Sequence, residues 1–232
     1  MTPPLRAAEL PVVVFRLGRA PDAWEWPDWT RAGDDGTFGN RYDDPDAQYR
    51  VLYASAERQT TLRECLARFR PDLAIRAAAI EEDDDEAPPS HPPGHLTRRW
   101  VSRRVMGTAT IDGAYCDIGH SSSIAHLRDA LAARVLYYGL DDLDAGDLRT
   151  RAPRRFTQEI SQYVFSRAAA DGGAAFHGIK YASRLGDELT NWAIFEPNAP
   201  TTLEHAEIAD DDPDLLAVMD AFDLRFLDEE RT

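Results

Sequence analysis

The chain has 232 residues, of which 43% are hydrophobic and 9% aromatic, a composition typical of one large folded domain. Its formal net charge of −15 at pH 7 argues against a general nucleic-acid or anionic-membrane binder, because both ligands require a basic surface. A local cluster of arginines could still hold a small anion. The two cysteines, Cys65 and Cys116, lack metal-ligand spacing, and no apolar run approaches the about 18 residues of a membrane span. We therefore expect a cytoplasmic protein with neither a membrane span nor a disulfide framework.

The first predicted elements are a strand and a long loop. Residues 1–10 look like a loose leader, and residues 11–17 (PVVVFRL) predict a buried strand with Arg16 near its end. Residues 20–46 are rich in Pro, Gly, Asp and Trp and form a stretch too long for a simple turn. Because long loops in compact domains often carry function, we expect this one to contribute to a site.

A strand–helix unit follows over residues 51–71. Residues 51–54 predict a strand, Ser55 is the expected N-cap of the helix, and Pro71 ends it. Apolar side chains recur at spacings of three and four and predict a buried stripe: Leu62, Cys65, Leu66 and Phe69. At about 100° per residue, Glu64 falls roughly 200° from the start of this stripe. Glu64 is therefore either a solvated helix carboxylate or a group that lines a cleft.

The middle of the chain predicts strands, an exposed insertion and a helix. Residues 72–80 predict a strand, and an exposed acidic and proline-rich insertion is expected over about residues 81–97. Residues 100–106 and 109–118 predict a hairpin about Gly107. Serines 121–123 would cap a helix that continues to Tyr138.

The C-terminal half predicts one more helix and several strands. The helix is expected over 155–170, and the strands over 174–183, 191–196 and 201–209. Strands and helices mix without a regular βαβ alternation, which indicates an α+β fold. The predicted organisation is one domain over residues 11–209, followed by an acidic C-terminal tail or helix over 210–232.

Familiar catalytic motifs are absent from the sequence. It contains no P-loop, no Rossmann glycine fingerprint and no GxSxG elbow. His91 and His95 are four residues apart, but the proline-rich stretch around them predicts no helix that would bring them together. We therefore expect no metal site.

The order of a few polar residues along the chain carries the functional signal. The segments are VFRL with Arg16, GNRY with Arg41 and Tyr42, VLYASAERQTTLREC with Tyr53 and Glu64, RRFTQEIS with Arg155, and HGIKYASRLGDELTNWAIFE with Ser183 and Asn191. This ordered set, over about residues 12–196, resembles the RES-domain family, which is named for an arginine, a glutamate and a serine. By position, the arginine is Arg16 or Arg41, the glutamate is Glu64 and the serine is Ser183.

The resemblance implies a fold and an activity. RES domains have an ADP-ribosyltransferase-like split β-sheet around an NAD cleft. Characterised members are bacterial toxins that cleave the nicotinamide bond of NAD with phosphate as acceptor, or transfer ADP-ribose to a protein. Many pair with an Xre-type antitoxin, and the toxins often form homodimers. The acidic insertion and a longer helical middle distinguish this chain from the compact toxins.

Physical chemistry suggests a role for each residue. A carboxylate such as Glu64 can stabilise the oxocarbenium-like state of nicotinamide–ribose cleavage. Arg16 and Arg41 suit the pyrophosphate, because arginine is a planar bidentate donor. Aromatic faces and polar groups that could contact the nucleotide come from Tyr42, Tyr53, Ser183 and Asn191, and Arg155 is held as a more distant contributor.

Each residue also has a structural interpretation. Arg16 could pair with one of the many acids, Tyr53 could belong to the core, and Ser183 could be a turn serine. For the whole protein, the expected function is an NAD-consuming enzyme with phosphate or water as acceptor. The alternatives are a protein ADP-ribosyltransferase and a non-catalytic nucleotide-binding or interaction module.

Overall fold

A computed structural model describes residues 4–71, 94–196 and 198–227. The strand predicted over 72–80 and most of the predicted insertion lie outside the described residues. Within the described ranges, no helix has the length and apolar character needed to cross a bilayer.

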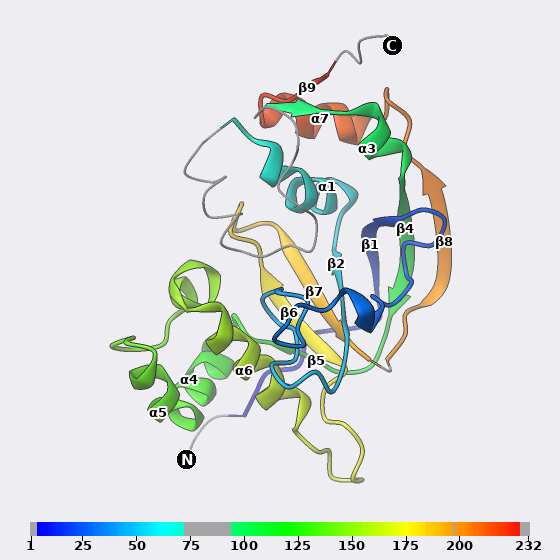
Figure 1. The fold of residues 1–232 in the computed structure, drawn as a ribbon. Coiled ribbons are helices and arrows are strands. Elements are labelled where there is room, and N and C mark those ends of the chain that lie inside the picture. The colour runs from blue at the N-terminus through cyan, green and yellow to red at the C-terminus, as the bar shows by residue number, and fades with distance from the viewer. Residues whose placement is uncertain (1–3, 72–93, 197, 228–232) are drawn as a thin grey trace.

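The fold is built on one large mixed sheet (Figure 1). Its seven strands are arranged in the order β5-β6-β7-β2-β1-β4-β8, and only the β5–β6 pair is parallel. The strands are β1 (Val12–Arg19), β2 (Val51–Ser55), β4 (Arg104–Ile111), β5 (Tyr115–Asp117), β6 (Gly178–Ala182), β7 (Thr190–Phe195) and β8 (Thr201–Glu207). A second small sheet pairs β3 (His95–Leu96) with β9 (Arg225–Phe226).

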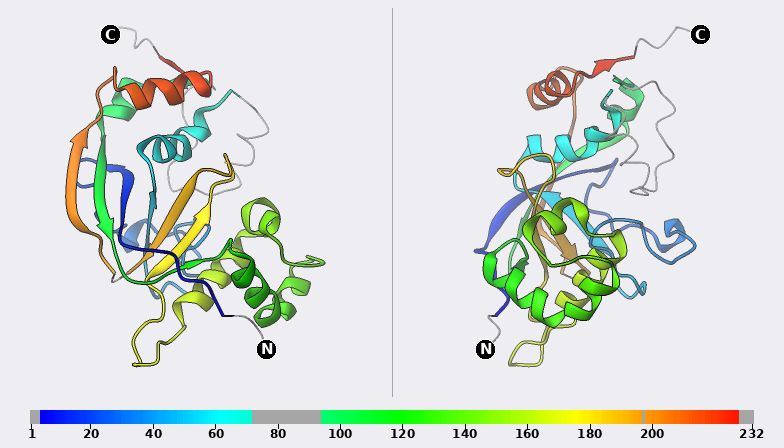
Figure 2. Two further views of the ribbon diagram at one scale, coloured as in Figure 1. Left: turned by 180° about the vertical axis from the view of Figure 1, so that it is seen from behind. Right: turned by 90° about the vertical axis from the view of Figure 1, so that its left-hand side faces the viewer.

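The helices form two groups at opposite ends of the sheet (Figures 1 and 2). One group contains α1 (Arg58–Leu66), the short helix Ala67–Phe69, α3 (Arg98–Ser102) and α7 (Pro213–Ala221). The other contains α4 (Ser121–Ala130), α5 (Ala132–Tyr137), a π-helical turn (Asp147–Arg151) and α6 (Arg154–Phe165). The long loop after β1 holds only one short 3-10 turn, Trp29–Arg31. Helices and strands mix without βαβ repeats, so the α+β class is confirmed.

The sheet is weakly joined between β1 and β2. The β1–β4 pair runs in register from Val12 opposite Ile111 to Arg19 opposite Arg104. In contrast, β1 and β2 meet only where Phe15 faces Ser55. The seven strands therefore behave as two smaller sheets that diverge at this junction, which is the predicted split.

The strand–helix unit forms largely as its periodicity predicts. Leu62, Leu66 and Phe69 are buried in a cluster that also contains residues of α7, and Cys65 lies at its edge. The expected cap is wrong, because the N-cap is Glu57 and its side chain makes no capping bond. Ser55 is instead the last residue of β2, and its hydroxyl donates a hydrogen bond to Asn191 of the neighbouring strand β7.

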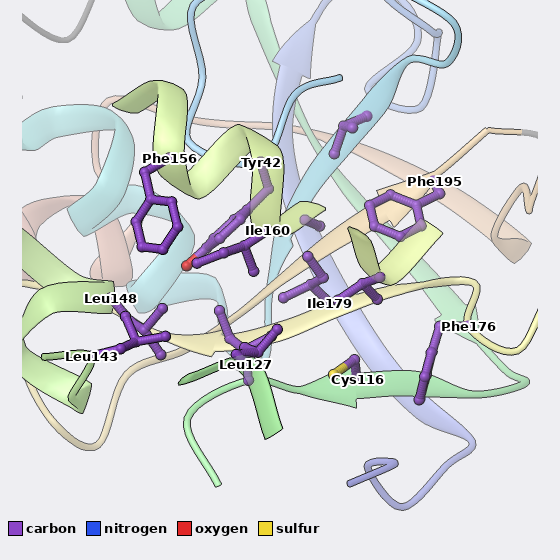
Figure 3. Close-up of a cluster of buried hydrophobic side chains, with 14 of the residues drawn as sticks. Tyr42, Cys116, Leu127, Leu143, Leu148, Phe156, Ile160, Phe176, Ile179 and Phe195 are labelled. Carbon is purple, nitrogen blue, oxygen red and sulfur yellow. The ribbon is translucent and has the colours of Figure 1, made fainter. Parts of the chain in front are cut away.

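A separate hydrophobic cluster lies between the sheet and the second helix group (Figure 3). Phe156 and Ile160 of α6 contact this cluster from one side, and Ile179 and Phe195 come from β6 and β7. Tyr42, from the long loop, is buried among them. This packing fixes the loop against the sheet close to the β1–β2 junction.

Residues 4–10, the described part of the predicted leader, are held against β5 and the start of α4. The backbone N–H of Ala8 donates to Tyr115, and the carbonyl of Arg6 accepts from Asp117, both at 2.8 Å. The N–H of Arg6 also donates to the Ser123 hydroxyl at 2.9 Å. This segment is held because the outer edge of β5 offers backbone groups that need partners.

The hairpin predicted about Gly107 is wrong. β4 passes straight through Gly107, which lies opposite Arg16, and residues 98–102 form α3 instead of a strand. A Cβ atom at Gly107 would lie 2.5 Å from Nε1 of Trp24. The glycine is therefore required by packing against a tryptophan and not by a turn.

Two helical predictions also need correction. The helix expected from residue 121 to Tyr138 is divided into α4 and α5, and the cap is His120, whose side chain accepts from the N–H of Ser122. In the C-terminal segment, Pro213–Ala221 form α7, which is part of the core because Leu215 and Val218 are buried against α1. Of the two predicted forms of this segment, it adopts the helix.

Candidate functional site

A cavity of about 230 Å³ lies at the junction where β1 and β2 diverge. Its wall is formed by β1, β2, α1, β6 and β7, together with the loop before β2 and the start of α6. The cavity brings together six of the seven predicted site residues: Arg16, Arg41, Tyr53, Glu64, Ser183 and Asn191. The first and last of these residues lie 175 positions apart in sequence, so the tertiary fold is needed to assemble them.

Strand register explains much of the wall. Tyr181 of β6 lies opposite Asn191 of β7, and Asn191 lies opposite Ser55 of β2. Residues directly opposite in antiparallel strands share a face of the sheet, and so do residues two apart on one strand. The side chains of Tyr181, Asn191, Ser55 and Tyr53 therefore face the same cavity, which α1 covers from the other side.

Glu64 is held by a short chain of hydrogen bonds. Nδ2 of Asn191 donates to Oε1 of Glu64 at 2.6 Å. The hydroxyl of Ser55 donates to Oδ1 of the same amide at 2.7 Å. Of the two interpretations of Glu64, the cleft-lining one is therefore observed, and the helix face opposite the apolar stripe is turned toward the cavity.

Arg16 is anchored on backbone carbonyls. Its Nε donates to Ala23 and its Nη1 to Tyr53, both at 2.8 Å. Burial lowers the pKa of the guanidinium from its ordinary value. Among the described residues, no carboxylate lies within ion-pair distance of Arg16, so the predicted structural pairing with an acid is not observed. A partly buried cation whose described partners are neutral favours an anionic ligand.

Arg41 is held from the opposite side of the cavity. Its Nη1 donates to the carbonyls of Leu148 and Arg149 in the π-helical turn, at 2.8 Å for Leu148. Next to it, the Asn40 N–H donates to the buried carboxylate of Asp43 at 2.8 Å. These contacts fix the loop that carries both Asn40 and Arg41.

Tyr53 lines the cavity, but its hydroxyl is already occupied. The hydroxyl donates to Oδ1 of Asp43 at 2.8 Å and accepts from the N–H of Tyr42 at 3.0 Å. Burial raises the pKa of the Asp43 carboxyl, and burial with the neighbouring Asp43 raises the pKa of Tyr53. The part of Tyr53 that remains for a ligand is its aromatic ring.

Ser183 lies at the end of β6, in a turn. Its hydroxyl accepts from the N–H of Leu185 at 2.9 Å, and its own N–H donates to Leu189 at 2.8 Å. The turn interpretation is therefore observed, although Ser183 also lines the cavity. Among the residues that the structure describes, none accepts a hydrogen bond from this hydroxyl, which leaves its hydrogen for a ligand oxygen.

One predicted site residue, Tyr42, and the more distant contributor, Arg155, lie away from the cavity. Tyr42 is 1% exposed and belongs to the hydrophobic cluster, with its ring 4.8 Å from that of Tyr181. It supports the wall from behind and does not line it. Arg155 is exposed and donates to the carbonyl of Pro45, while its neighbour Arg154 lines the cavity.

Sequence reasoning missed several wall residues. Tyr181, Arg68 and Arg184 were not selected, and Ser55 was assigned to a helix cap. Two of these positions had a local signal, because Arg68 is one helical turn from Glu64 and Arg184 directly follows Ser183. For Tyr181 the signal is strand alternation, since it lies two residues before Ser183.

The cavity has an unusual charge for this protein. Its described lining holds a single carboxylate, Glu64, and five arginines: Arg16, Arg41, Arg68, Arg154 and Arg184. The chain as a whole has a net charge of −15. Concentrated positive charge in a partly enclosed site favours binding of an anion. Within the described part of the chain, no group of three His, Cys, Asp or Glu side chains is placed to hold a metal ion.

Comparisons with known proteins agree with this architecture. The sequence matches the RES domain over residues 13–216. The structure is similar to a chain in the crystal structure of the M. tuberculosis MbcT–MbcA toxin–antitoxin complex, with a TM-score of 0.53 and 12% sequence identity. That similarity covers 94% of this chain and 91% of the other. No curated protein sequence matches the chain. At 12% identity the structural likeness concerns the fold, and the predicted ADP-ribosyltransferase-like α+β sheet is confirmed.

Proposed function

The chain belongs to the RES domain family, and on that premise we propose that it consumes NAD by cleaving the bond between nicotinamide and ribose. The proposed acceptor is inorganic phosphate or water. Nicotinamide then leaves as a neutral molecule, and the other product is ADP-ribose, which carries the added phosphate when phosphate is the acceptor.

The observation that supports this proposal is the pairing of one positioned carboxylate with surrounding arginines. Glycosidic cleavage at ribose passes through an oxocarbenium-like state, which a nearby carboxylate stabilises. Glu64 is the carboxylate of the described cavity wall, and Asn191 holds one of its oxygens at 2.6 Å. In NAD the nicotinamide ring is a positively charged pyridinium, and it leaves as neutral nicotinamide. Cleavage therefore requires no strong general acid to protonate the leaving group.

The arginines suit the diphosphate of NAD. Guanidinium groups bind phosphate oxygens through paired, charge-assisted hydrogen bonds. Arg16 and Arg41 are already anchored on backbone carbonyls, so less side-chain entropy is lost when an anion binds. The ring of Tyr53 and that of Tyr181 offer flat faces for the nicotinamide.

The size of the cavity limits how much of the dinucleotide it encloses. Its volume of about 230 Å³ lies below the roughly 300 Å³ at the lower end of pockets for drug-sized ligands. We therefore assign it to the nicotinamide riboside end and the adjoining phosphates, with the adenosine end outside.

The proposed function is tested by following the fate of NAD. Purified protein is incubated with NAD, with and without inorganic phosphate, and the products are identified by mass spectrometry. Glu64→Gln is run in parallel, because glutamine keeps the shape of the side chain and removes its charge. Nicotinamide release that requires phosphate and is lost in Glu64→Gln is the expected result.

Other outcomes separate the alternatives. Release without phosphate would identify water as the acceptor. A gain of ADP-ribose mass on protein would identify a protein ADP-ribosyltransferase. No NAD loss, even with cell extract as a source of acceptors, would contradict the enzyme and favour a nucleotide-binding module.

A protein partner is part of the proposal. The similar fold was solved in a toxin–antitoxin complex, and we propose that this chain also acts as a toxin with an antitoxin of the Xre type. Co-expression with the product of an adjacent gene, followed by affinity purification and an NAD assay of the complex, tests this. Free, fully active protein in the presence of that product would contradict it.

A further inference from the structure

Asn191 occupies an unusual position for a ligand-binding residue. It is 2% exposed, and Ser55, which it faces across the β2–β7 pair, is 4% exposed. One end of its amide contacts Glu64 and the other end contacts Ser55. Little of the amide is therefore left to bind a nucleotide.

The donor and acceptor groups fix the direction of this chain of hydrogen bonds. An ionised carboxylate only accepts, so the NH₂ group of Asn191 must face Glu64. The amide oxygen then faces Ser55, whose hydroxyl can donate to it. Without that hydroxyl, the amide oxygen would lose its donor, and the amide would be held at the Glu64 end alone.

The backbone makes the arrangement rigid. Ser55 is the residue at which β2 pairs with both neighbours, with Phe15 on one side and Asn191 on the other. Its position is therefore set by three strands at the point where the sheet divides. Glu64 comes from α1, and within the described residues its carboxylate is tied to the sheet through the amide of Asn191.

We propose that Ser55 and Asn191 are positioning residues that hold the carboxylate of Glu64 in its reactive orientation. Asn191 thus acts on the reaction through Glu64 and not as a nucleotide contact. The catalytic part of this inference rests on the proposed NAD-consuming function. The hydrogen-bonded chain itself does not, and the two are tested separately.

The first test observes the hydrogen bonds without any substrate. In a ¹⁵N-correlated NMR spectrum, the side-chain NH₂ of Asn191 is assigned by its absence in Asn191→Leu. We expect one of its protons to be shifted strongly downfield by the charged, short bond to Glu64. The shift should be reduced in both Glu64→Gln and Ser55→Ala, and Ser55→Thr, which restores a hydroxyl, should recover it.

The control for this test is another buried serine. Ser161 of α6 is 0% exposed, and its hydroxyl donates to the carbonyl of Tyr42 at 2.6 Å. It does not line the cavity. Ser161→Ala removes a buried hydroxyl of the same kind, and we expect it to leave the Asn191 resonance unchanged.

The second test is kinetic. Misplacing a catalytic group by about 1 Å can cost roughly 100-fold in rate, so kcat should fall about tenfold in Ser55→Ala and about 100-fold in Asn191→Leu. KM for NAD should stay within about twofold in both variants, because neither residue contacts the nucleotide. Ser55→Thr should restore most of kcat, and Ser161→Ala should change neither constant.

Different results would overturn the hydrogen-bonded chain and its catalytic role. An Asn191 resonance that is unaffected by Ser55→Ala would overturn the hydrogen-bonded chain. A raised KM with unchanged kcat in Asn191→Leu would show that Asn191 contacts NAD and would overturn the positioning role. If the wild-type protein consumes no NAD, the proposed function fails, and the NMR measurements still decide whether Ser55 and Asn191 hold Glu64.

Discussion

The guanidinium of Arg16 donates to the backbone carbonyl of Tyr53 at 2.8 Å, across two strands that otherwise meet at a single residue pair. The same side chain donates to Ala23 in the loop after β1. Arg16 therefore joins both halves of the sheet at the edge of the cavity. Its role is structural as well as electrostatic, because it completes the hydrogen bonding of carbonyls that β1 does not reach.

We expect Arg16→Ala to lower both stability and NAD affinity. Two carbonyls would lose a charged donor, and each such bond contributes about 1.5–3 kcal/mol. Urea denaturation should show a loss of at least about 2 kcal/mol, and calorimetry on the folded fraction should show weaker NAD binding. Arg16→Lys should recover little, because an ammonium group cannot reproduce the two-carbonyl geometry of a guanidinium.

Arg103, which directly precedes β4, provides a matched arginine control. Its side chain is exposed, so Arg103→Ala should change stability by less than about 0.5 kcal/mol. Equal losses in the Arg16 and Arg103 variants would contradict the bridging role of Arg16.

Tyr181→Phe should weaken NAD binding while leaving the fold intact. Within the described ranges, no side chain or backbone group hydrogen-bonds the Tyr181 hydroxyl, which lies in the cavity wall near Glu64. Burial and the Glu64 charge raise the pKa of Tyr181, so the hydroxyl remains a proton donor at neutral pH. We expect a roughly tenfold loss of NAD affinity, equivalent to about 1.4 kcal/mol, measured by calorimetry.

Tyr53→Phe serves for comparison, because the Tyr53 hydroxyl is bound to Asp43. We expect Tyr53→Phe to lower the free energy of unfolding more than it lowers the affinity for NAD. The idea that the Tyr181 hydroxyl meets the ligand fails if Tyr181→Phe binds NAD as well as the wild type.

Two adjacent leucines of α7 test whether the C-terminal helix belongs to the core. Leu215 is 1% exposed and contacts the cluster of α1, whereas Leu216 is 45% exposed. Leu215→Ala should cost about 2–5 kcal/mol, as for other buried leucines. Leu216→Ala should be nearly neutral in the same urea denaturation experiment. Removal of residues 210–232 should therefore yield no stably folded protein, and a soluble, cooperative truncation would refute this assignment.

The Arg50–Glu196 ion pair predicts a pH dependence of stability. Hydrogen bonds from Arg50, one at 2.8 Å from its Nε, lower the pKa of Glu196 from its ordinary value of 4.5. As the pH falls, Glu196 is therefore protonated in the unfolded chain before it is protonated in the folded protein. The contribution of the ion pair to folding stability is complete above pH 4.5 and is lost as the pH falls through the lowered pKa of the folded state. Glu196→Gln should cost up to about 1 kcal/mol at pH 7.

The difference between wild type and Glu196→Gln should vanish in strong acid, as measured by urea denaturation between pH 7 and pH 2. Glu204→Gln, at an exposed position on β8, controls for general charge effects and should show no such convergence. A constant difference at every pH would exclude the ion pair as its origin.

The sequence alone determined the local elements of the site. The apolar stripe of α1 left Glu64 on the opposite face, and that face lines the cavity. The strand pattern around Arg16 and the order of the polar residues were also sufficient to predict the fold class and the RES-domain resemblance. Local periodicity carries this information because helix and strand geometry fix which side chains share a face.

How these residues act depends on contacts between distant parts of the chain. Ser55 and Asn191 lie 136 residues apart in sequence, and their pairing depends on the register between β2 and β7. Position 107, in the middle of β4, requires a glycine because Trp24, from the loop after β1, packs on it. Arg68, Arg154 and Arg184 meet at one cavity because separate elements converge there. Such contacts arise from long-range packing, and sequence spacing does not record them.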